Sequence, residues 1–281
     1  MSGDSRYFAE LTSPEVEALL SADARPVLLL PVGSVEAHGP HLPLGTDTLI
    51  SLGMSTRVSE TFADPVDLRI LPTVPYAVTR YAGRFKGTIH IEESTLRALL
   101  VELCESLISQ GFRYIVIVNN HFEPEHVRTL HGAIDEIARR TGSIPGFLDL
   151  TRRYRAERLS REFRELGSHA GQYETSLILA ERDDLVKVDL LPRLAPNRVN
   201  LGAMTGGAGI ADFERMGLPL AYNGSPADAT PTEGEQSFET LVAMLGEVIL
   251  DLVRGDGGRD LPGRFARAAA DGATNEPPSA A

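Results

Sequence analysis

The apolar positions of the chain follow two repeating patterns. Runs that are apolar throughout, VLLLP at 27–31 and YIVIV at 114–118, predict strands covered on both faces. Elsewhere apolar residues recur at helical spacing, most clearly over 94–110, where leucines form one stripe that ends before Gly111 and Ser94 is the expected N-cap. Because strands and helices alternate, we predict an α/β fold: a single layered domain with a mainly parallel sheet flanked by helices on both faces.

The same patterns locate the remaining elements. Helices are expected at 48–63, from Pro124 to Ile137, at 172–182 and at 238–252, and strands at 68–76, 87–92 and 144–150. The charged segment 152–166 is predicted to be a solvated helix, and the stretch 192–233, rich in Pro, Gly and Asn, a loop region. With no linker or repeat in view, residues 1–266 are predicted to form one domain and 267–281 a disordered tail.

Composition and charge narrow the class of protein. A chain of 281 residues can bury a sizeable core, and a net charge of -12 without a long basic run argues against nucleic acid or an anionic membrane as partner. No apolar run is long enough for a transmembrane helix, and the first residues lack the apolar core of a signal peptide. Cys104 is the only cysteine, which excludes an intrachain disulfide. We therefore expect a cytoplasmic protein.

One short stretch after the first predicted strand concentrates ligand-type side chains. It reads GSVEAHGPHLPLGTD and holds Glu36, His38, His41 and Asp47. In an extended segment Glu36 and His38 point the same way, so both can face one metal cluster. Asp47 has two carboxylate oxygens and could bridge two cations, which would then lie roughly 3.5–4 Å apart.

A second pair of such residues follows another strand. His121 and Glu123 come directly after the run at 114–118. Since the carboxyl ends of parallel strands meet at one edge of a sheet, we expect the two groups to converge there. Mixed oxygen and nitrogen donors favour Zn²⁺, Mn²⁺ or Fe²⁺ over Ca²⁺. The sequence therefore predicts a metal centre at this edge.

Other polar residues have more ordinary interpretations. Isolated histidines usually make only hydrogen bonds, which is the expectation for His90, His126 and His131. Three basic residues have two possible roles: Arg80, Arg84 and Lys86. Either all three are surface charges, or one of them reaches the site and binds an anionic substrate.

Four sequence blocks resemble the creatininase (creatinine amidohydrolase) family. In family order they read PVGSVEAHGPHLPLGTD, GTIHIEESTL, GFRYIVIVNNHFEPE and, at 169–176, HAGQYETS. The resemblance runs from about residue 26 to 185 and is weaker in the C-terminal third. It implies a creatininase-like layered α/β subunit, commonly assembled as a homohexamer.

The resemblance also implies two metal ions per subunit. Glu36, Asp47 and His121 would bind one ion. His38, Asp47 and Glu123 would bind the second, so that Asp47 is the bridge.

Three residues are the catalytic candidates on the same basis: His169, Glu123 and Glu174. His169 resembles the family's catalytic histidine, which passes a proton to the leaving nitrogen. Glu174 matches the glutamate of the ETS block, which lies behind the ligands or, in some relatives, binds a metal. His41 is expected to orient its neighbours.

Two departures from the family pattern bear on the ligands and the substrate. Many members read NGHGGN where this chain reads NNHFEPE, and its order His-aromatic-Glu follows creatininase itself, which supports Glu123 as a ligand. The chain has no tryptophan, whereas creatininase closes tryptophans over its flat cyclic substrate. Another aromatic, such as Tyr81, Phe122 or Tyr173, would have to serve.

The sequence thus predicts a dinuclear metal-dependent amidohydrolase. It would use two divalent ions, Zn, Mn or Fe, to cleave an amide or cyclic amide C–N bond of a small molecule, in the manner of creatinine amidohydrolase. Two alternatives within the family stay open: a formamide hydrolase acting on a pyrimidine intermediate, and a peptidase acting on a small modified peptide. A third is a metal- or ligand-binding oligomer without turnover.

Overall fold

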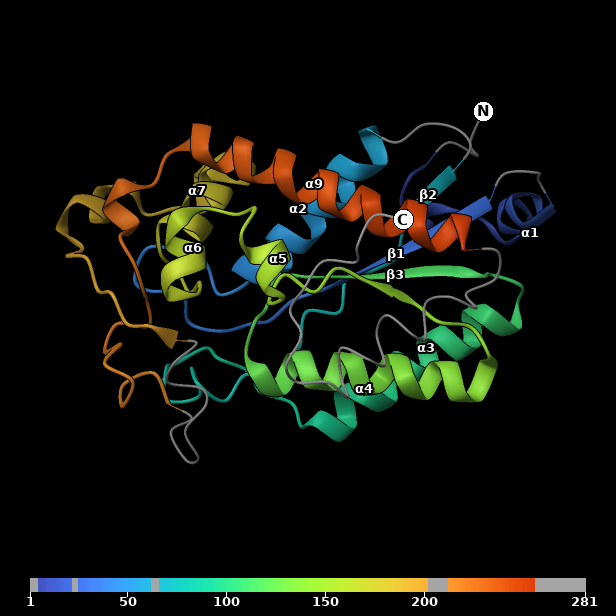
Figure 1. Cartoon of the computed structure of the whole chain (residues 1–281), viewed down its shortest axis with the longest axis horizontal. Helices are drawn as coiled ribbons and strands as arrows, with labels where there is room; N and C mark the ends of the chain where they lie inside the picture. The colour runs from blue at the N-terminus through green and yellow to red at the C-terminus, as the bar shows by residue number, and fades with distance from the viewer. Residues whose placement is uncertain (1–4, 22–24, 62–65, 202–211, 256–281) are drawn as a thin grey trace.

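Four parallel strands form the sheet at the centre of the fold (Figure 1). They are β1 (Arg25–Val32), β2 (Val66–Ile70), β3 (Tyr114–Asn119) and β4 (Gly146–Phe147), in the order β2-β1-β3-β4. β1 pairs with β3 from Val27 opposite Tyr114 to Val32 opposite Asn119, so these two strands end side by side. The computed structural model describes residues 5–21, 25–61, 66–201 and 212–255; the predicted tail at 267–281 lies outside them.

Helices cover both faces of the sheet, which confirms the predicted α/β architecture (Figure 1). One face carries α2 (Thr46–Thr61), α7 (Gln172–Glu181) and α9 (Pro231–Arg254). The other carries α1 (Ser13–Ser21), α3 (Glu93–Ser109) and α4 (Pro124–Thr141). Two short helices, α5 (Arg153–Ala156) and α6 (Arg161–Leu166), join β4 to α7. None of the described helices combines the length and the apolar content needed to cross a membrane.

The alternation of side chains along the central strands builds two hydrophobic cores. Val27 and Leu29 of β1 pack toward α2, α7 and α9, whereas Leu28 and Leu30 pack toward α1, α3 and α4. All four side chains are buried. Burying one such side chain contributes about 1.5–3 kcal/mol. Because both faces are covered, β1 is an uninterrupted apolar run rather than an alternating one.

The order of the strands determines where a site can form. The chain leaves β1 for β2 through α2, then returns past β1 to β3 through α3 on the opposite face. The loops that follow β1 and β3 therefore start from neighbouring strands and run to opposite faces of the sheet. In open parallel sheets, ligands bind at such a switch point.

Three predicted strands are shorter than expected. β2 ends at Ile70, because Pro72 and Pro75 have no N–H to donate to a ladder. The segment 87–92 makes only the bridge between His90 and Ala77, because α3 begins directly after it. β4 is limited to two residues at the sheet edge, where Pro145 precedes it.

The charged segment 152–166 is not one solvated helix. Ser160 caps α6 by accepting a hydrogen bond from the Phe163 backbone N–H at 3.3 Å, which separates α6 from α5. Leu159 and Phe163 are buried, so this segment packs against the protein rather than lying free in solvent. The N-cap of α3 also differs from the prediction, because Glu92, not Ser94, occupies it.

α7 and α9 approach each other closely at a glycine. A Cβ added at Gly234 of α9 would lie 1.9 Å from the backbone oxygen of Ser176 in α7. Only a residue without a side chain permits this contact. The packing of α9 therefore positions α7, whose first turn carries Glu174.

We expect the substitution Gly234→Ala to lower the free energy of unfolding by about 1–3 kcal/mol, because the methyl group forces the two helices apart. Urea denaturation measures the effect. Gly45→Ala is the matched control, since no heavy atom lies within 4 Å of its added Cβ. It should change stability by no more than about 0.5 kcal/mol. Equal stability of the two variants would contradict the prediction.

Candidate metal centre

The two predicted groups of ligand-type residues meet beyond the ends of β1 and β3. Glu36 lies in the loop after β1, Asp47 in the first turn of α2, and His121 two residues after β3. His121 Nδ1 lies 3.2 Å from Glu36 Oε1 and 3.0 Å from Asp47 Oδ2. The convergence predicted from the sequence is therefore present in the structure.

A third segment contributes to the same place. His38 Nε2 lies 3.2 Å from Asp47 Oδ1 and 3.8 Å from Oε2 of Glu174, the third residue of α7. His169, just before α7, places Nδ1 3.8 Å from Glu36 Oε1. The segment 169–174 thus closes the site from the side of α7.

These side chains form three overlapping sets of donors that could each hold a metal ion. In every set the ligand atoms lie within 4.8 Å of one another, and all the residues are buried. The sets are Glu36, Asp47 and His121; His38, Asp47 and Glu174; and Glu36, His38 and His169. The first is the ligand set expected for one metal. The second shares Asp47 with it but contains Glu174 where Glu123 was expected.

Backbone carbonyls determine which ring nitrogen of each histidine faces the centre. His38 Nδ1 lies 3.1 Å from the Glu36 carbonyl, and His121 Nε2 lies 2.9 Å from the Val78 carbonyl. Because a carbonyl can only accept, both nitrogens must donate a proton. In the neutral ring the other nitrogen then turns a lone pair toward the carboxylates. This orientation by an outer hydrogen bond is typical of metal-binding histidines.

The carboxylates are held in a similar way. Ser34 Oγ donates to Asp47 Oδ2 at 2.7 Å, and the Thr79 hydroxyl donates to Glu36. The Ala170 N–H donates to Glu174 Oε2 at 2.5 Å from a backbone with φ of 51°, a left-handed conformation that non-glycine residues rarely adopt. Strain of this kind is retained where the surrounding structure requires it, as at binding sites.

The buried negative charge of the cluster requires positive charge beside it. Glu36, Asp47 and Glu174 are at most 2% exposed, and their ion-pair partners within the described part of the chain are all histidines. Burial would raise the pKa of Asp47, but His38 and His121 hold it well below its usual value. Burial would likewise lower the pKa of His38, yet the surrounding carboxylates, Asp47 foremost, raise it to about 10.

A proton or a metal ion can supply this positive charge. Acceptor nitrogens and carboxylate oxygens about 3 Å apart repel each other unless a cation lies between them. Mixed imidazole and carboxylate donors at these positions suit a divalent transition metal. The residues present therefore fit a metal centre.

Glu123 occupies a different position from the one expected. Its carboxylate accepts hydrogen bonds from the backbone N–H groups of Arg80 at 2.8 Å and Tyr81 at 3.1 Å. Burial raises its pKa to about 7. Glu123 belongs to none of the three donor sets found among the described residues, although it lines the adjoining cavity. Its role as a ligand stays a prediction.

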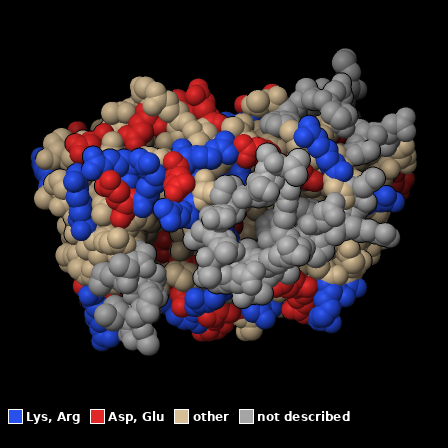
Figure 2. Space-filling model, viewed as in Figure 1, with Lys and Arg blue, Asp and Glu red and all other residues tan. Residues whose placement is uncertain are grey.

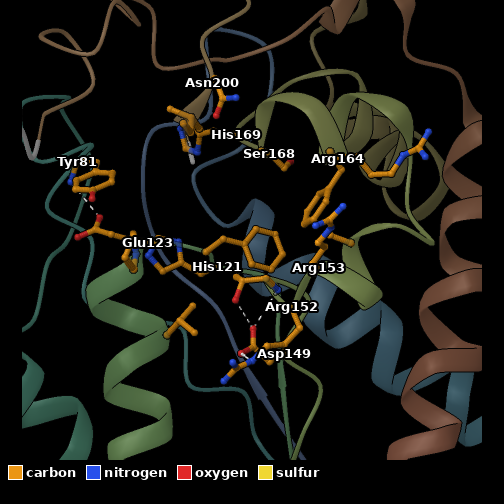
Figure 3. Close-up of a pocket in the computed structure, with 18 of the residues that line it drawn as sticks. Tyr81, His121, Glu123, Asp149, Arg152, Arg153, Arg164, Ser168, His169 and Asn200 are labelled. Atoms are coloured by element: carbon orange, nitrogen blue, oxygen red, sulfur yellow. Dashed lines mark hydrogen bonds and ion pairs between the residues drawn. The ribbon is translucent and has the colours of Figure 1, made fainter. Parts of the chain in front are cut away.

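A cavity of about 620 Å³ adjoins the cluster, and Glu36, His121 and His169 form part of its wall. In Figure 3, Tyr81 and Glu123 lie on one side of His121, and Arg152 and Arg153 on the other.

Four aromatic side chains also line this cavity: Tyr81, Phe122, Phe163 and Phe213. Tyr81 and Phe122 were among the expected replacements for tryptophan. Tyr173 was expected too, but it does not line the cavity; it is fully buried and packs against Phe163 at 5.0 Å between ring centroids. Phe163 and Phe213 were not predicted, because both lie outside the recognisable sequence blocks.

Residues 9–249 match the model of the creatininase family, described as creatinine amidohydrolase. The chain belongs to the creatininase family. Membership implies a metal-dependent hydrolase and confirms the family predicted from the sequence blocks.

Two relatives show the range of activities in this family. The mycofactocin precursor peptide peptidase of Mycolicibacterium smegmatis is 34% identical over 221 residues, which cover 77% of this chain and 81% of the relative. The creatinine amidohydrolase of Pseudomonas putida is 28% identical over 202 residues, covering 66% and 75%. A solved structure of creatininase in a manganese form superposes with a TM-score of 0.72 at 24% identity, covering 88% of this chain and 98% of that one. At this identity the likeness shows the fold.

The remaining histidines make ordinary hydrogen bonds, as predicted. His126 Nε2 lies 3.0 Å from Asn119 Oδ1, His131 Nε2 lies 2.9 Å from Asp149 Oδ2, and His90 Nδ1 accepts from the Thr79 N–H. His41 is buried and bonds Thr175 Oγ1 at 2.9 Å. This contact joins the motif loop to α7, in keeping with an orienting role.

The three cations considered as substrate contacts do not line the cavity. Arg80 pairs with Glu92 and Glu93, and Arg84 pairs with Asp212 and Glu214. Lys86 is exposed. Arg80, Arg84 and Lys86 therefore act as surface charges rather than as contacts to a substrate in this cavity.

Metal content should identify the ligands. We expect Asp47→Asn to lose both ions, because the two donor sets share this carboxylate. Glu174→Gln should retain about one ion, whereas Glu123→Gln should retain both, since its carboxylate bonds backbone amides instead. Elemental analysis of the purified variants measures this. If Glu123→Gln loses an ion and Glu174→Gln keeps both, the geometry-based assignment of the second set is wrong and the family-based one holds.

Proposed function

We propose that the protein is a hydrolase with two divalent cations per chain that cleaves an amide or cyclic amide C–N bond. The observation that carries this proposal is the position of Asp47 between two donor sets, with each of its carboxylate oxygens facing a different histidine. The creatininase family provides the reaction class. The substrate class is inferred from the cavity.

The metal ligands follow from the donor sets. Glu36, Asp47 and His121 would hold one cation, and His38, Asp47 and Glu174 the other. Bound cations would polarise the substrate carbonyl and lower the pKa of water, so that hydroxide is available near neutral pH. Zn²⁺, Mn²⁺ and Fe²⁺ all suit these donors.

His169 is positioned to move a proton. Its Nε2 lies 2.9 Å from the Ala37 carbonyl and must donate to it, so Nδ1 is the nitrogen that can accept. Burial lowers the pKa of His169 to about 4, which leaves the ring neutral. In the proposed reaction Nδ1 first accepts a proton from the attacking water and then delivers it to the nitrogen of the breaking C–N bond.

The cavity favours a substrate larger than creatinine. Its volume of about 620 Å³ is in the range that accommodates drug-sized molecules. The ring of Phe213 lies against His169, with centroids 4.2 Å apart, where it can exclude water from the proton path. Peptide hydrolysis is therefore the second candidate, supported by this volume and by the peptidase relative from M. smegmatis.

Family resemblance also supports two further proposals. We propose that the chain assembles as a homohexamer and that it acts in the cytoplasm on a small-molecule amide, without nucleic acid or membrane as partner. Its net charge of -12 supports the exclusion of nucleic acid.

Substrate specificity tests the proposed function directly. The purified, metal-loaded protein should hydrolyse N-acylated amino acids or short peptides faster than creatinine or a formamidopyrimidine, because the cavity exceeds the size of the smaller ring. Creatine formation measures the rate with creatinine, whose ring opens without releasing an amine, and amine release measures the rate with the other substrates. A chelator should abolish turnover, and added Zn²⁺ or Mn²⁺ should restore it. Metal-loaded protein that cleaves none of these amides would refute the proposal in favour of a binding protein without turnover.

His169→Ala should retain the metal ions but slow turnover by about 10²–10⁴-fold, the usual contribution of a proton-transferring side chain. Elemental analysis and steady-state kinetics on the same preparation separate the two effects. Loss of an ion would show that His169 is a ligand, as the third donor set allows. Unchanged turnover would exclude it from proton transfer.

A further inference from the structure

The cavity changes charge along its length. Its inner end is formed by Glu36 and Glu123 beside the metal-binding histidines. Its outer end carries three arginines: Arg152, Arg153 and Arg164. In Figure 2, basic side chains, with acidic ones among them, gather over α5 and α6. A concentration of arginine at one cavity mouth is unexpected in a chain of net charge -12.

A buried carboxylate holds one of these arginines in place. Asp149, which follows β4, is 7% exposed and accepts from Arg152 Nε at 2.9 Å. It also accepts from His131 Nε2 at 2.9 Å and from the Thr151 N–H at 3.0 Å. The side chain of Arg152 is 23% exposed. The guanidinium is therefore fixed against the cavity wall rather than moving freely in solvent.

The other charges at this end leave an excess of positive charge. Arg164 has no ion-pair partner within the part of the chain that the structure describes, although it lines the cavity. Glu165, the acidic neighbour that could neutralise it, pairs instead with Arg161 at 2.8 Å. Arg153 pairs with Glu157 at the C-cap of α5. A further lining arginine, Arg128 of α4, pairs with Glu125 of the same helix.

We propose that the outer end of the cavity, defined by Arg152 and Arg164, binds a carboxylate of the substrate while the C–N bond lies at the metal centre. This proposal rests on the proposed function. It assigns the substrate class: amides that carry a free carboxylate, such as N-acylated amino acids or the carboxyl end of a short peptide. Asp149 and His131 position Arg152 and do not touch the substrate.

A carboxylate fits this end better than a phosphate. The planar guanidinium binds either group through paired hydrogen bonds. Asp149 and Glu165 also line the outer end, however, and they would repel a doubly charged phosphate more strongly than a single carboxylate.

The test compares three probes that differ only at one end. N-acetylglycylglycine carries the carboxylate, its C-terminal amide is neutral, and N-acetylglycyl-O-phosphoethanolamine carries a phosphate. Calorimetric titration of the metal-loaded protein gives the dissociation constants, and amine release follows hydrolysis separately. Wild-type protein should bind the acid about 10–100-fold more tightly than the amide, because charge-assisted hydrogen bonds are lost with the neutral end.

Variants then locate the contact. Arg152→Gln and Arg164→Gln should each reduce the preference for the acid, and the double variant should abolish it. Arg164 is exposed, so its variant should fold even if loss of Arg152 disturbs Asp149. Arg139→Gln is the matched control: it removes an arginine of α4 that is 72% exposed and does not line the cavity. This control should keep the full preference.

Three outcomes overturn the proposal. Equal binding of acid and amide by the wild type excludes an anion site. A preference that persists in the double variant assigns the carboxylate to the metal ions instead. Tighter binding of the phosphate probe than of the acid makes this a phosphate site. Failure of the proposed function looks different, because no probe is then hydrolysed while the arginine-dependent preference for the acid remains.

Discussion

Electrostatic repulsion among three buried carboxylates is the constraint on which this structure depends. Glu36, Asp47 and Glu174 lie in one small volume, almost without contact with solvent. Desolvated like charges at this spacing would destabilise the fold by far more than the few kcal/mol that separate folded from unfolded proteins. The inward-facing nitrogens of His38 and His121 reduce the repulsion when they are protonated, and bound cations would remove it. Metal binding at this site would therefore be coupled to folding.

The scaffold keeps these groups together through short connections. β1 and β3 are hydrogen-bonded neighbours that end at the same level, so the residues following them cannot separate widely. Asp47 and Glu174 lie in the first turns of α2 and α7, where the partial positive charge of the helix end stabilises a carboxylate. The close packing of α9 against α7 at Gly234 helps to hold in place the helix that carries Glu174. Residues remote from the chemistry thus control its geometry.

The donor cluster and the cavity have different consequences for function. The donor residues of the cluster lie in the recognisable family blocks. They bear on the type of reaction, rather than on which substrate is bound. The cavity wall comes largely from segments outside the blocks, including α5, α6 and the residues around Phe213. Variation in this wall can change the substrate without altering the donor residues. A family that includes a creatinine amidohydrolase and a peptide peptidase is consistent with that division.

The sequence by itself determined the architecture and most of the centre. Apolar runs and helical stripes are local patterns, so β1, β3 and the long helices could be predicted from them, and the position of Glu36, His38, Asp47 and His121 after two strands predicted their convergence. Tertiary structure alone decided which carboxylate joins His38 and Asp47, because Glu123 bonds backbone amides of a distant loop while α7 presents Glu174. It also decided that part of the charged segment 152–166 lines a cavity, since the burial of Leu159 and Phe163, rather than any local pattern, places Arg152, Arg153 and Arg164 at the cavity wall.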